Sequence, residues 1–497
     1  MVIGAGPNGL VAACVLAEAG LSTLVLERHP RRAGGAVASE AATLPGYLHD
    51  VGAAFFPFAS ASPAFAALRL DQVGLRFAHA EVQSCHPAPD GSAASIYRDD
   101  DLTARSFGGA DGDRWRRVMR WHRRVEPRLL ATLLGPLPSF GAALRLGPLD
   151  LLRFAAIGLS SGAGLARRWF QSEAARRVLP GLALHVDLGP HDPFSAALGY
   201  MLGTMAASGG NAVPLGGAQA VTRALLARLN GAGGRVRLGA EVARIDLDGK
   251  RARGVRLADG EQIAARRVIL ANTDAAALFL RLLPERVVSG RLRRAMGRFR
   301  RGWGTFKVDW ALDGPVPWTH GEARRAAVVH AGDSLADLAC FTAEVRGGAL
   351  PSNPYLVIGQ QSLVDPSRAP EGGHTLWAYS RVPPTPAGGW ASVRERFADQ
   401  VEARIERLAP GFRTHIRARR VVTPPDLEAM NPNLVGGDLG GGSNGWRNQL
   451  LFRPVFPYFR YRTPVEALYL CSSYAHPGAG VHGMCGFNAA RVALTRL

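Results

Sequence analysis

The sequence is poor in cysteine, in lysine and in long uncharged runs, and each shortage excludes a class of protein. Its five cysteines form no Cys-x-x-Cys pair, which argues against a disulfide scaffold, a zinc ribbon and a dithiol redox centre. The longest stretch without Asp, Glu, Lys or Arg covers residues 193–222, but glycines and Pro214 interrupt it. Its dense apolar part, residues 194–207, is too short to cross a bilayer and predicts a buried helix.

Charge is the second imbalance, because 59 basic residues against 40 acidic ones give a formal net charge of +19. Only Lys250 and Lys307 are lysines, so nearly all of the basic residues are arginines, spread over the whole chain. The sequence contains no compact basic and aromatic module, which argues against nucleic-acid binding. The chain opens on an apolar strand-like segment that leaves no room for a signal peptide, and this predicts a cytoplasmic protein.

The first 27 residues predict a dinucleotide-binding unit. An apolar strand at residues 1–3 runs into a glycine-rich turn and a helix of small residues, and a second strand then ends at Glu27. Gly4 permits the tight turn, Gly6 lets the backbone approach a pyrophosphate, and Gly9 lets the helix pack closely on the strand. The pyrophosphate would lie at the amino end of the helix, where unpaired N–H groups and the helix dipole favour negative charge.

Two features next to this unit favour FAD over the nicotinamide dinucleotides. Glu27 is placed to accept hydrogen bonds from both ribose hydroxyls, and it would repel the 2′-phosphate of NADP. Gly34 and Gly35 follow it by seven and eight residues, as in the extended fingerprint of flavoprotein oxidoreductases. Such a glycine pair lets the chain pass the pyrophosphate a second time, and it is not expected of NAD dehydrogenases.

Two later segments carry a similar glycine-rich pattern. Residues 214–229 and 235–245 combine a Gly-Gly turn, a helix and strand-like runs. Near the C-terminus, an apolar strand at 468–471 runs into a turn that contains Gly478, Gly480 and Gly483, and a helix follows. A strand, a glycine turn and a helix start suit backbone N–H groups that approach a flavin and its phosphate arm.

With these motifs the chain resembles the phytoene-desaturase-like, or carotenoid-desaturase-type, branch of FAD-dependent oxidoreductases, within the amine-oxidase and glutathione-reductase-type superfamily. The resemblance implies that Val242 meets the adenine through its backbone and that the C-terminal glycine turn lies beside the flavin. The predicted cofactor-binding residues are Gly4, Gly6, Pro7, Asn8, Gly9, Glu27, Arg28, Gly34, Gly35, Val242, Gly478, Gly480, Val481 and Gly483.

The resemblance also implies an α/β fold in which a Rossmann-like FAD-binding domain is interleaved with an α+β substrate domain. The predicted FAD-binding domain comprises residues 1–75, 212–290 and 430–497, and the predicted substrate domain comprises residues 76–211 and 291–429. The first part of the substrate domain is predicted to be helical. In its second part, strand-like runs at 305–312, 355–358 and 375–379 predict a sheet that covers the flavin.

A flavin performs hydride chemistry by itself, so a catalytic acid or base is optional. His476 and His482 flank the C-terminal glycine turn and are candidates for moving a proton, although such histidines also cap turns or contact cofactor. No metal site is predicted. No second Gly-x-Gly-x-x-Gly follows, which favours oxygen, a quinone or another carrier as the electron acceptor.

The resemblance implies oxidation of a hydrophobic small molecule by hydride transfer to flavin N5, with desaturation as the first choice. Residues 194–207 and the Trp377–Tyr379 region are expected to line the substrate pocket. Amine oxidation and a flavin-dependent isomerisation remain open as alternatives. So does an FAD-binding interaction protein without turnover, in which access to the flavin would be filled.

For the predicted helix at residues 114–130, two alternatives remain open: contact with an anionic membrane surface, or a solvated face on a packed helix. Its apolar residues recur at helical spacing against a dense set of arginines. The arginines would contact anionic headgroups if Trp115 and Met119 entered the acyl boundary, which would make the protein peripherally membrane-associated. Alternatively, the apolar stripe packs inward and the arginines are merely solvated.

Overall fold

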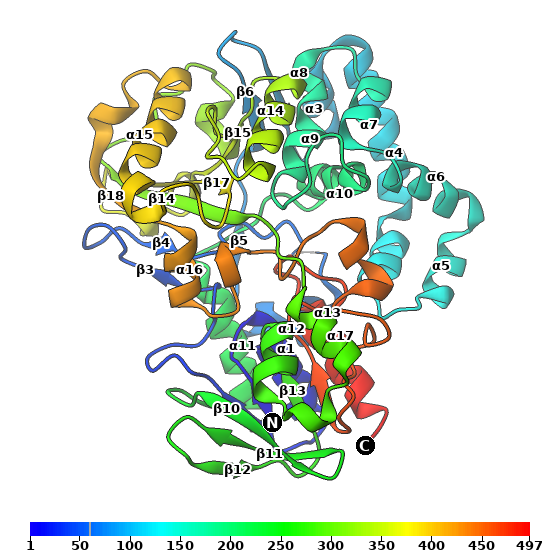
Figure 1. Cartoon of the computed structure of the whole chain (residues 1–497). Helices are drawn as coiled ribbons and strands as arrows, with labels where there is room; N and C mark the ends of the chain where they lie inside the picture. The colour runs from blue at the N-terminus through cyan, green and yellow to red at the C-terminus, as the bar shows by residue number, and fades with distance from the viewer. Residues whose placement is uncertain (59–60) are drawn as a thin grey trace.

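The computed structural model describes residues 1–58 and 61–497. A five-stranded parallel sheet lies at the centre of the lower half in Figure 1, and both chain termini lie close to it. Its order is β19-β13-β1-β2-β9. The strands are β1 (Val2–Ile3), β2 (Leu24–Leu26), β9 (Arg235–Arg237), β13 (Ile269–Ala271) and β19 (Leu468–Leu470). The predicted Rossmann-like α/β unit is therefore confirmed, and it is assembled from three distant stretches of chain.

Small residues allow the helices of this half to pack closely. Helix α1 (Pro7–Glu18) contacts both α11 (Gln219–Gly231) and α17 (Met484–Leu494). At the crossing of α1 and α17, a side-chain carbon at Gly486 would stand 1.8 Å from the Asn8 carbonyl oxygen. An antiparallel sheet of β10 (Val242–Asp248), β11 (Arg251–Leu257) and β12 (Gln262–Ala264) extends the lower half in Figure 1.

A seven-stranded mixed sheet forms part of the upper half, in the order β18-β14-β17-β16-β15-β6-β7. The strands are β6 (Val82–Pro87), β7 (Ala93–Ile96), β14 (Gly304–Leu312), β15 (Ala326–Ala331), β16 (Leu356–Gly359), β17 (His374–Val382) and β18 (Ile416–Val422). The three predicted strand-like runs correspond to β14, β16 and β17. Apolar residues of α15 (Trp390–Leu408) pack on this sheet and form one core with it.

Helices fill the stretch between β7 and residue 208, as the sequence predicts. They are α3 (Asp100–Phe107), α4 (Gly109–Leu134), α5 (Phe140–Leu146), α6 (Pro148–Gly158), α7 (Gly162–Trp169), α8 (Glu173–Arg176), α9 (Val178–Ala183) and α10 (Ser195–Ser208). Helix α10 matches the predicted buried helix, and it packs against α9, α6 and α7. This packing makes α10 a core element of the helical block.

Short elements complete the fold. They are α2 (Pro63–Leu68), β3 (Ser39–Glu40), β4 (His49–Asp50), β5 (Phe77–Ala78), β8 (Val213–Pro214), α12 (Ala275–Ala277), α13 (Gly290–Gly297), α14 (Leu335–Arg346) and α16 (Pro424–Met430).

Of the two alternatives for residues 114–130, the structure agrees with the helix whose apolar stripe packs inward. Trp115 and Met119 are fully buried in the core that α4 shares with its neighbours. Arginines on the opposite face form ion pairs within the molecule: Arg116 with Asp101, and Arg123 with Asp100. The apolar stripe therefore packs inward, because neighbouring helices already cover the surface that a bilayer would need.

A different apolar surface remains exposed on α5 and α6. Phe140, Leu144, Leu149, Leu152 and Leu159 each expose between 66% and 81% of their surface. Among residues 1–58 and 61–497, no helix combines the length and the hydrophobicity needed to cross a membrane.

Candidate functional site

The N-terminal glycine turn leaves no room for side chains. Gly4 has a left-handed φ of +88°, and its N–H donates to the Leu26 carbonyl at the end of the neighbouring strand. A side-chain carbon at Gly9 would stand 2.1 Å from the Gly4 carbonyl oxygen. A carbon at Gly6 would meet the Asn272 amide nitrogen at 2.8 Å. Asn272, which directly follows β13, thus packs against the glycine turn.

The amino end of α1 is open to a ligand. It starts at Pro7, and no side chain of the described residues caps it. Asn8 is buried, yet its Oδ1 finds no hydrogen-bond partner within the described chain. A buried polar atom without a partner is costly, so an orphan at a helix amino end indicates a missing binding partner.

Glu27 directly follows β2, and its carboxylate binds the backbone of the N-terminal glycine turn. Its Oε2 accepts a hydrogen bond from Ala5 N at 2.7 Å, and its Oε1 accepts one from His29 N at 2.8 Å. Each carboxylate oxygen retains a second lone pair for another donor. The Glu27 carbonyl accepts from Ala240 N, which brings the start of β10 with Val242 to the same end of the sheet. Arg28 points elsewhere, and its guanidinium is 3.9 Å from the exposed carboxylate of Glu241.

The Gly34–Gly35 pair packs against the N-terminal glycine turn. Gly34 N donates to the Ala5 carbonyl at 2.8 Å, and both Gly34 and Gly35 have positive φ. A side-chain carbon at Gly35 would lie 3.5 Å from the Gly6 Cα. The chain therefore passes the turn a second time, in the arrangement that the spacing of the two glycine motifs predicts.

The C-terminal glycine turn follows β19 at the same edge of the parallel sheet. Gly478, Gly480 and Gly483 all have positive φ, and Gly483 starts α17 against Val11 of α1. Val481 lies between them and is half-buried. The buried Arg453 fixes this region by donating to the carbonyl of Ser473 and to those of Gly440 and Gly441.

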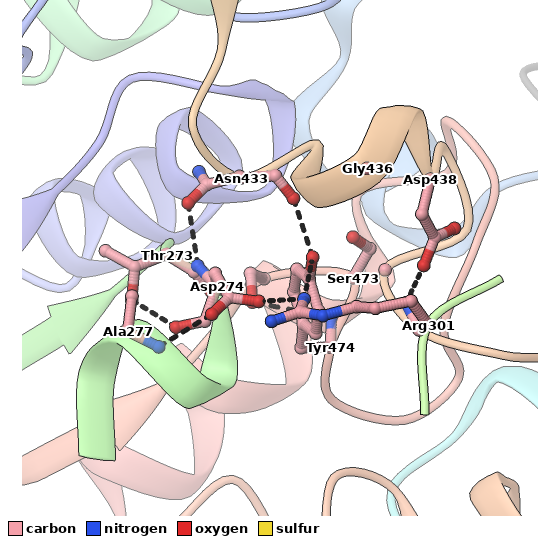
Figure 2. A network of polar contacts seen from close by, with 12 residues as sticks. Thr273, Asp274, Ala277, Arg301, Asn433, Gly436, Asp438, Ser473 and Tyr474 are labelled. Carbon is pink, nitrogen blue, oxygen red and sulfur yellow. Dashed lines mark hydrogen bonds and ion pairs between the residues drawn. The ribbon is translucent and has the colours of Figure 1, made fainter. Parts of the chain in front are cut away.

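A polar network joins the ends of β13 and β19, as Figure 2 shows. Asp274 caps α12 by accepting from Ala277 N at 2.6 Å, and it also accepts from the Arg301 guanidinium. Arg301 donates to the Tyr474 hydroxyl at 2.8 Å, and that hydroxyl donates to the Asn433 carbonyl at 2.6 Å. The network ties four segments together near the carboxyl ends of the strands, where α/β sheets bind their ligands.

The two candidate histidines are both buried. Burial lowers the pKa of His476 and of His482 to about 4, so both rings are neutral at pH 7. His482 Nδ1 accepts from Met484 N at 3.0 Å, which makes it a cap for the start of α17. His476 Nε2 has no hydrogen-bond partner within the described chain, and its ring lies beside the backbone of Leu133 and Gly135 at the end of α4.

Comparison with known proteins also indicates a dinucleotide-binding oxidoreductase. A family profile for a NAD(P)-binding Rossmann-like domain matches residues 2–69. The chain is 28% identical to the pyridine nucleotide-disulfide oxidoreductase domain-containing protein 2 of Mus musculus, covering 99% of this chain and 92% of that protein. It is also 28% identical to a phytoene dehydrogenase of Streptomyces griseus, over 86% and 83% of the two chains.

Over nearly its full length the chain is thus similar, at about 28% identity, to phytoene dehydrogenase-like FAD/NAD(P)-binding oxidoreductases. Its fold is similar to that of a putrescine oxidase solved with putrescine bound, with a TM-score of 0.60, at 20% identity over 100% of this chain and 98% of that one. The chain thus has a fold similar to that of an amine oxidase and a sequence similar to that of a phytoene dehydrogenase.

This phytoene dehydrogenase-like chain has an aromatic cluster next to the polar network. Phe55, Trp303 and Tyr379 are half-buried and pack against a small apolar core that includes Trp377. The rings of Trp377 and Tyr379 are stacked with centroids 5.7 Å apart. Trp303 is two residues from Arg301, so the cluster adjoins the ends of β13 and β19. Of the two regions expected to line a pocket, the Trp377–Tyr379 region thus lies close to the candidate cofactor site.

One group of potential metal ligands lies away from this site. Atoms of Cys85, His320 and Glu322 come within 4.8 Å of one another. Burial raises the pKa of Cys85 to about 12, so it is a thiol at neutral pH. The Glu322 carboxylate already accepts hydrogen bonds from Ser95 and Tyr97. His320 Nδ1, by contrast, has no hydrogen-bond partner among the described residues.

The sequence analysis missed the side chains that support the turns. Asn272, Arg301 and Arg453 hold the glycine segments in place, yet none of them belongs to a motif. Their partners lie between 12 and 268 residues away along the chain. A pattern within a short window therefore contains no signal for them.

Proposed function

We propose that the protein is an FAD-dependent oxidoreductase that removes a hydride from a hydrophobic small molecule, with desaturation as its reaction. The observation that carries the proposal is the convergence of two glycine turns, Glu27 and an uncapped helix end at the carboxyl edge of one parallel sheet. The buried and unpartnered Asn8 Oδ1 at that helix end supports a ligand there. The match of residues 2–69 to a NAD(P)-binding Rossmann-like domain profile also supports a dinucleotide at this place.

The proposed roles follow from the geometry. The amino end of α1 and the Gly34–Gly35 pair would hold the pyrophosphate, and the free lone pairs of Glu27 would accept from the ribose hydroxyls. Val242 would contact the adenine through its backbone. The Gly478–Gly483 turn would lie beside the flavin ring. When bound, the flavin supplies the hydride acceptor, and the protein positions the substrate and excludes water.

The aromatic cluster supports a hydrophobic substrate. Phe55, Trp303 and Tyr379 offer a half-buried apolar surface at the border between the polar network and the mixed sheet. Apolar side chains that remain accessible inside a fold favour apolar ligands. We also propose that residues 1–75, 212–290 and 430–497 form the cofactor-binding domain, because all five strands of the parallel sheet come from them. Residues 76–211 and 291–429 would form the substrate domain.

An absorbance spectrum of the purified protein tests the cofactor. We expect a yellow protein that binds FAD non-covalently. Glu27→Ala should weaken FAD binding by about 1–3 kcal/mol, because charge-assisted hydrogen bonds are lost. Glu371→Ala, at an exposed carboxylate, is the matched control and should bind FAD like the parent. A colourless protein that cannot be reconstituted with FAD would exclude the proposal.

Anaerobic mixing with chemically distinct probes tests the reaction. An isoprenoid polyene in detergent should bleach the oxidised flavin band. Bleaching by primary amines alone would instead favour an amine oxidase, the alternative that the putrescine oxidase fold supports. A probe that is rearranged without net bleaching would indicate an isomerase. FAD binding without bleaching by any of these probes would favour an interaction protein without turnover.

A further inference from the structure

A thiol, an imidazole and a carboxylate meet near the β7 edge of the mixed sheet. One potential ligand atom each from Cys85, His320 and Glu322 lies within 4.8 Å of the other two. Cys85 belongs to β6, and the other two belong to the segment that leads into β15. Strand β15 pairs with β6, with Val329 opposite Cys85, and this pairing brings the segment before β15 beside β6.

Hydrogen bonds hold the segment that carries two of these side chains. Gln360, which directly follows β16, accepts from Trp318 Nε1 at 2.8 Å and donates to the Ala323 carbonyl at 2.9 Å. These bonds fix the chain on both sides of His320 and Glu322. Side chains on a fixed segment lose little conformational freedom when they bind a ligand, so the arrangement is preorganised.

The Glu322 carboxylate binds uncharged donors only. Its Oε1 accepts from the Tyr97 hydroxyl at 2.6 Å, and its Oε2 accepts from Ser95 Oγ at 2.8 Å and from Ser106 Oγ at 3.1 Å. Within the described part of the chain, no Arg or Lys lies within ion-pair distance of it. A carboxylate has about four acceptor positions, so Oε1 keeps one for a cation.

The other two side chains lie beside this carboxylate. Cys85 of β6 is directly opposite Ser95 of β7 in an antiparallel pair, so both side chains stand on one face of the sheet. Ser95 donates to Glu322, which places the thiol and the carboxylate on the same side. His320 Nδ1 is buried without a hydrogen-bond partner, and an unpaired nitrogen of this kind is costly. An orphan imidazole nitrogen next to a thiol and an uncompensated carboxylate indicates a cation.

We propose that Cys85, His320 and Glu322 bind a zinc ion, which fastens the segment before β15 to β6. Zinc takes thiolate, imidazole and carboxylate ligands, whereas magnesium and calcium prefer oxygen ligands alone. On binding, the Cys85 thiol gives its proton to solvent water and a sulfur–zinc bond forms. Cys85 is fully buried, and His320 and Glu322 are half-buried, so the ion enters from their side. Water completes the tetrahedral set of ligands.

The hydroxyl groups around Glu322 are compatible with a bound ion. Carboxylates that bind metals are themselves hydrogen-bonded, and these bonds orient the ligand. Ser95, Tyr97 and Ser106 would take this role. The sequence analysis predicts no metal site, because Cys85 lies far along the chain from His320 and Glu322. The site lies on the mixed sheet, and the inference does not depend on the proposed function.

Zinc retention by the full-length protein tests the site. The protein is stripped of metal with a chelator, equilibrated with zinc sulfate and gel-filtered, and elemental analysis then measures the zinc retained. We expect stoichiometric zinc in the parent and in Cys340→Ser, which removes an exposed thiol. Cys85→Ser and His320→Gln should each weaken binding more than about a hundredfold, and Ser95→Ala about tenfold, because a group that orients a ligand contributes less than the ligand. His191→Gln, at an exposed histidine, should match the parent.

Cobalt(II) in place of zinc identifies the ligands. The difference spectrum against the metal-free protein should show a sulfur-to-cobalt charge-transfer band and the visible bands of tetrahedral cobalt, and Cys85→Ser should lose the first. If Cys85→Ser does not fold, His320→Gln and Glu322→Gln decide the question, because both side chains are half-buried at the surface. A parent that retains no zinc would overturn the site, and so would zinc that is lost in Cys340→Ser but kept in Cys85→Ser. Neither measurement requires FAD or turnover, so failure of the proposed function would leave this result unchanged.

Discussion

The parallel sheet of the lower half and the mixed sheet of the upper half bury different kinds of side chain. Strands β1, β13 and β19 carry apolar residues that are all buried. The mixed sheet instead buries ionisable groups on its central strands, among them His86, Lys307, Asp309, His330 and Arg381. Around Lys307, the ammonium donates to the Asp309 carboxylate and to the carbonyl of Asp50 from β4.

This difference shows how each half depends on the rest of the chain. An apolar strand followed by a glycine turn needs only general hydrophobic burial and a permissive backbone. A buried charge is tolerated only where partners from other segments offset its loss of hydration. The parallel sheet therefore depends mainly on close backbone approach, and the mixed sheet depends on long-range polar pairing. Three predictions test one side of this comparison each, and a fourth concerns the helical block.

The largest effect is expected from a side chain in the N-terminal glycine turn. Gly9→Ala would place a carbon 2.1 Å from the Gly4 carbonyl oxygen, and both partners are backbone of the central strand and its helix. We expect no folded protein in the soluble fraction, because overpacking against backbone cannot be relieved by a rotamer change. Gly141→Ala is the control, since a carbon there meets nothing within 4 Å. Soluble Gly9→Ala with the parent circular dichroism spectrum would contradict the role of close approach.

The buried ion pairs beside the mixed sheet come next. Arg368 is fully buried and binds Asp50 at 2.8 Å and Asp365 at 2.7 Å. Arg368→Met would leave two buried carboxylates without their cation and should lower the free energy of unfolding by about 3–5 kcal/mol. Urea denaturation measures the change. Arg237→Met, which breaks an exposed pair with Glu261, should change stability by less than about 1 kcal/mol. Similar losses in the two variants would show that long-range pairing does not distinguish the mixed sheet.

The buried histidines should make stability depend on pH. Burial lowers the pKa of His49 to about 4, below the value of about 6.5 for an unfolded chain. Between these values the unfolded state binds more protons, so stability is full above pH 6.5 and falls as the pH approaches 4. We expect His49 alone to contribute about 3 kcal/mol to this loss. His49→Gln should flatten the pH dependence of the urea midpoint, whereas the exposed control His191→Gln should follow the parent curve. A parent midpoint that does not change between pH 7 and 5 would refute the prediction.

The smallest effect concerns vesicle binding, which compares α4 with α5 and α6. Residues 135–168 contain one carboxylate, Asp150, and it is already paired with Arg124. Exposed leucines among unpaired arginines favour an anionic lipid surface. We expect Leu144→Ser with Leu149→Ser to reduce flotation with anionic vesicles several-fold, because each exposed leucine buries only part of its surface in the lipid. Arg120→Gln on α4 should change little. The reverse result would restore α4 as the contact surface.

The half of the fold with the parallel sheet could be predicted from the sequence in considerable detail. The glycines at positions 4, 6 and 9 act within a six-residue window, and Glu27 ends the next strand. Backbone requirements of this kind leave a local pattern that a single sequence displays. The three strand-like runs of the upper half are also local, because alternation along one strand reports its own burial. The sequence left two alternatives open for α4, because an amphipathic pattern does not specify what covers its apolar face.

The sequence by itself determined the glycine turns, the acidic end of β2, the strands and the helices, because each depends on neighbours along the chain. The tertiary structure decided where Asn272, Arg301 and Arg453 support those turns. It also decided that Ser84, His185 and His330, separated by up to 246 residues, form one hydrogen-bonded chain. A side-chain hydrogen bond requires its two atoms within about 3 Å of each other. When the partners lie in distant segments, only the folded arrangement of those segments supplies that proximity.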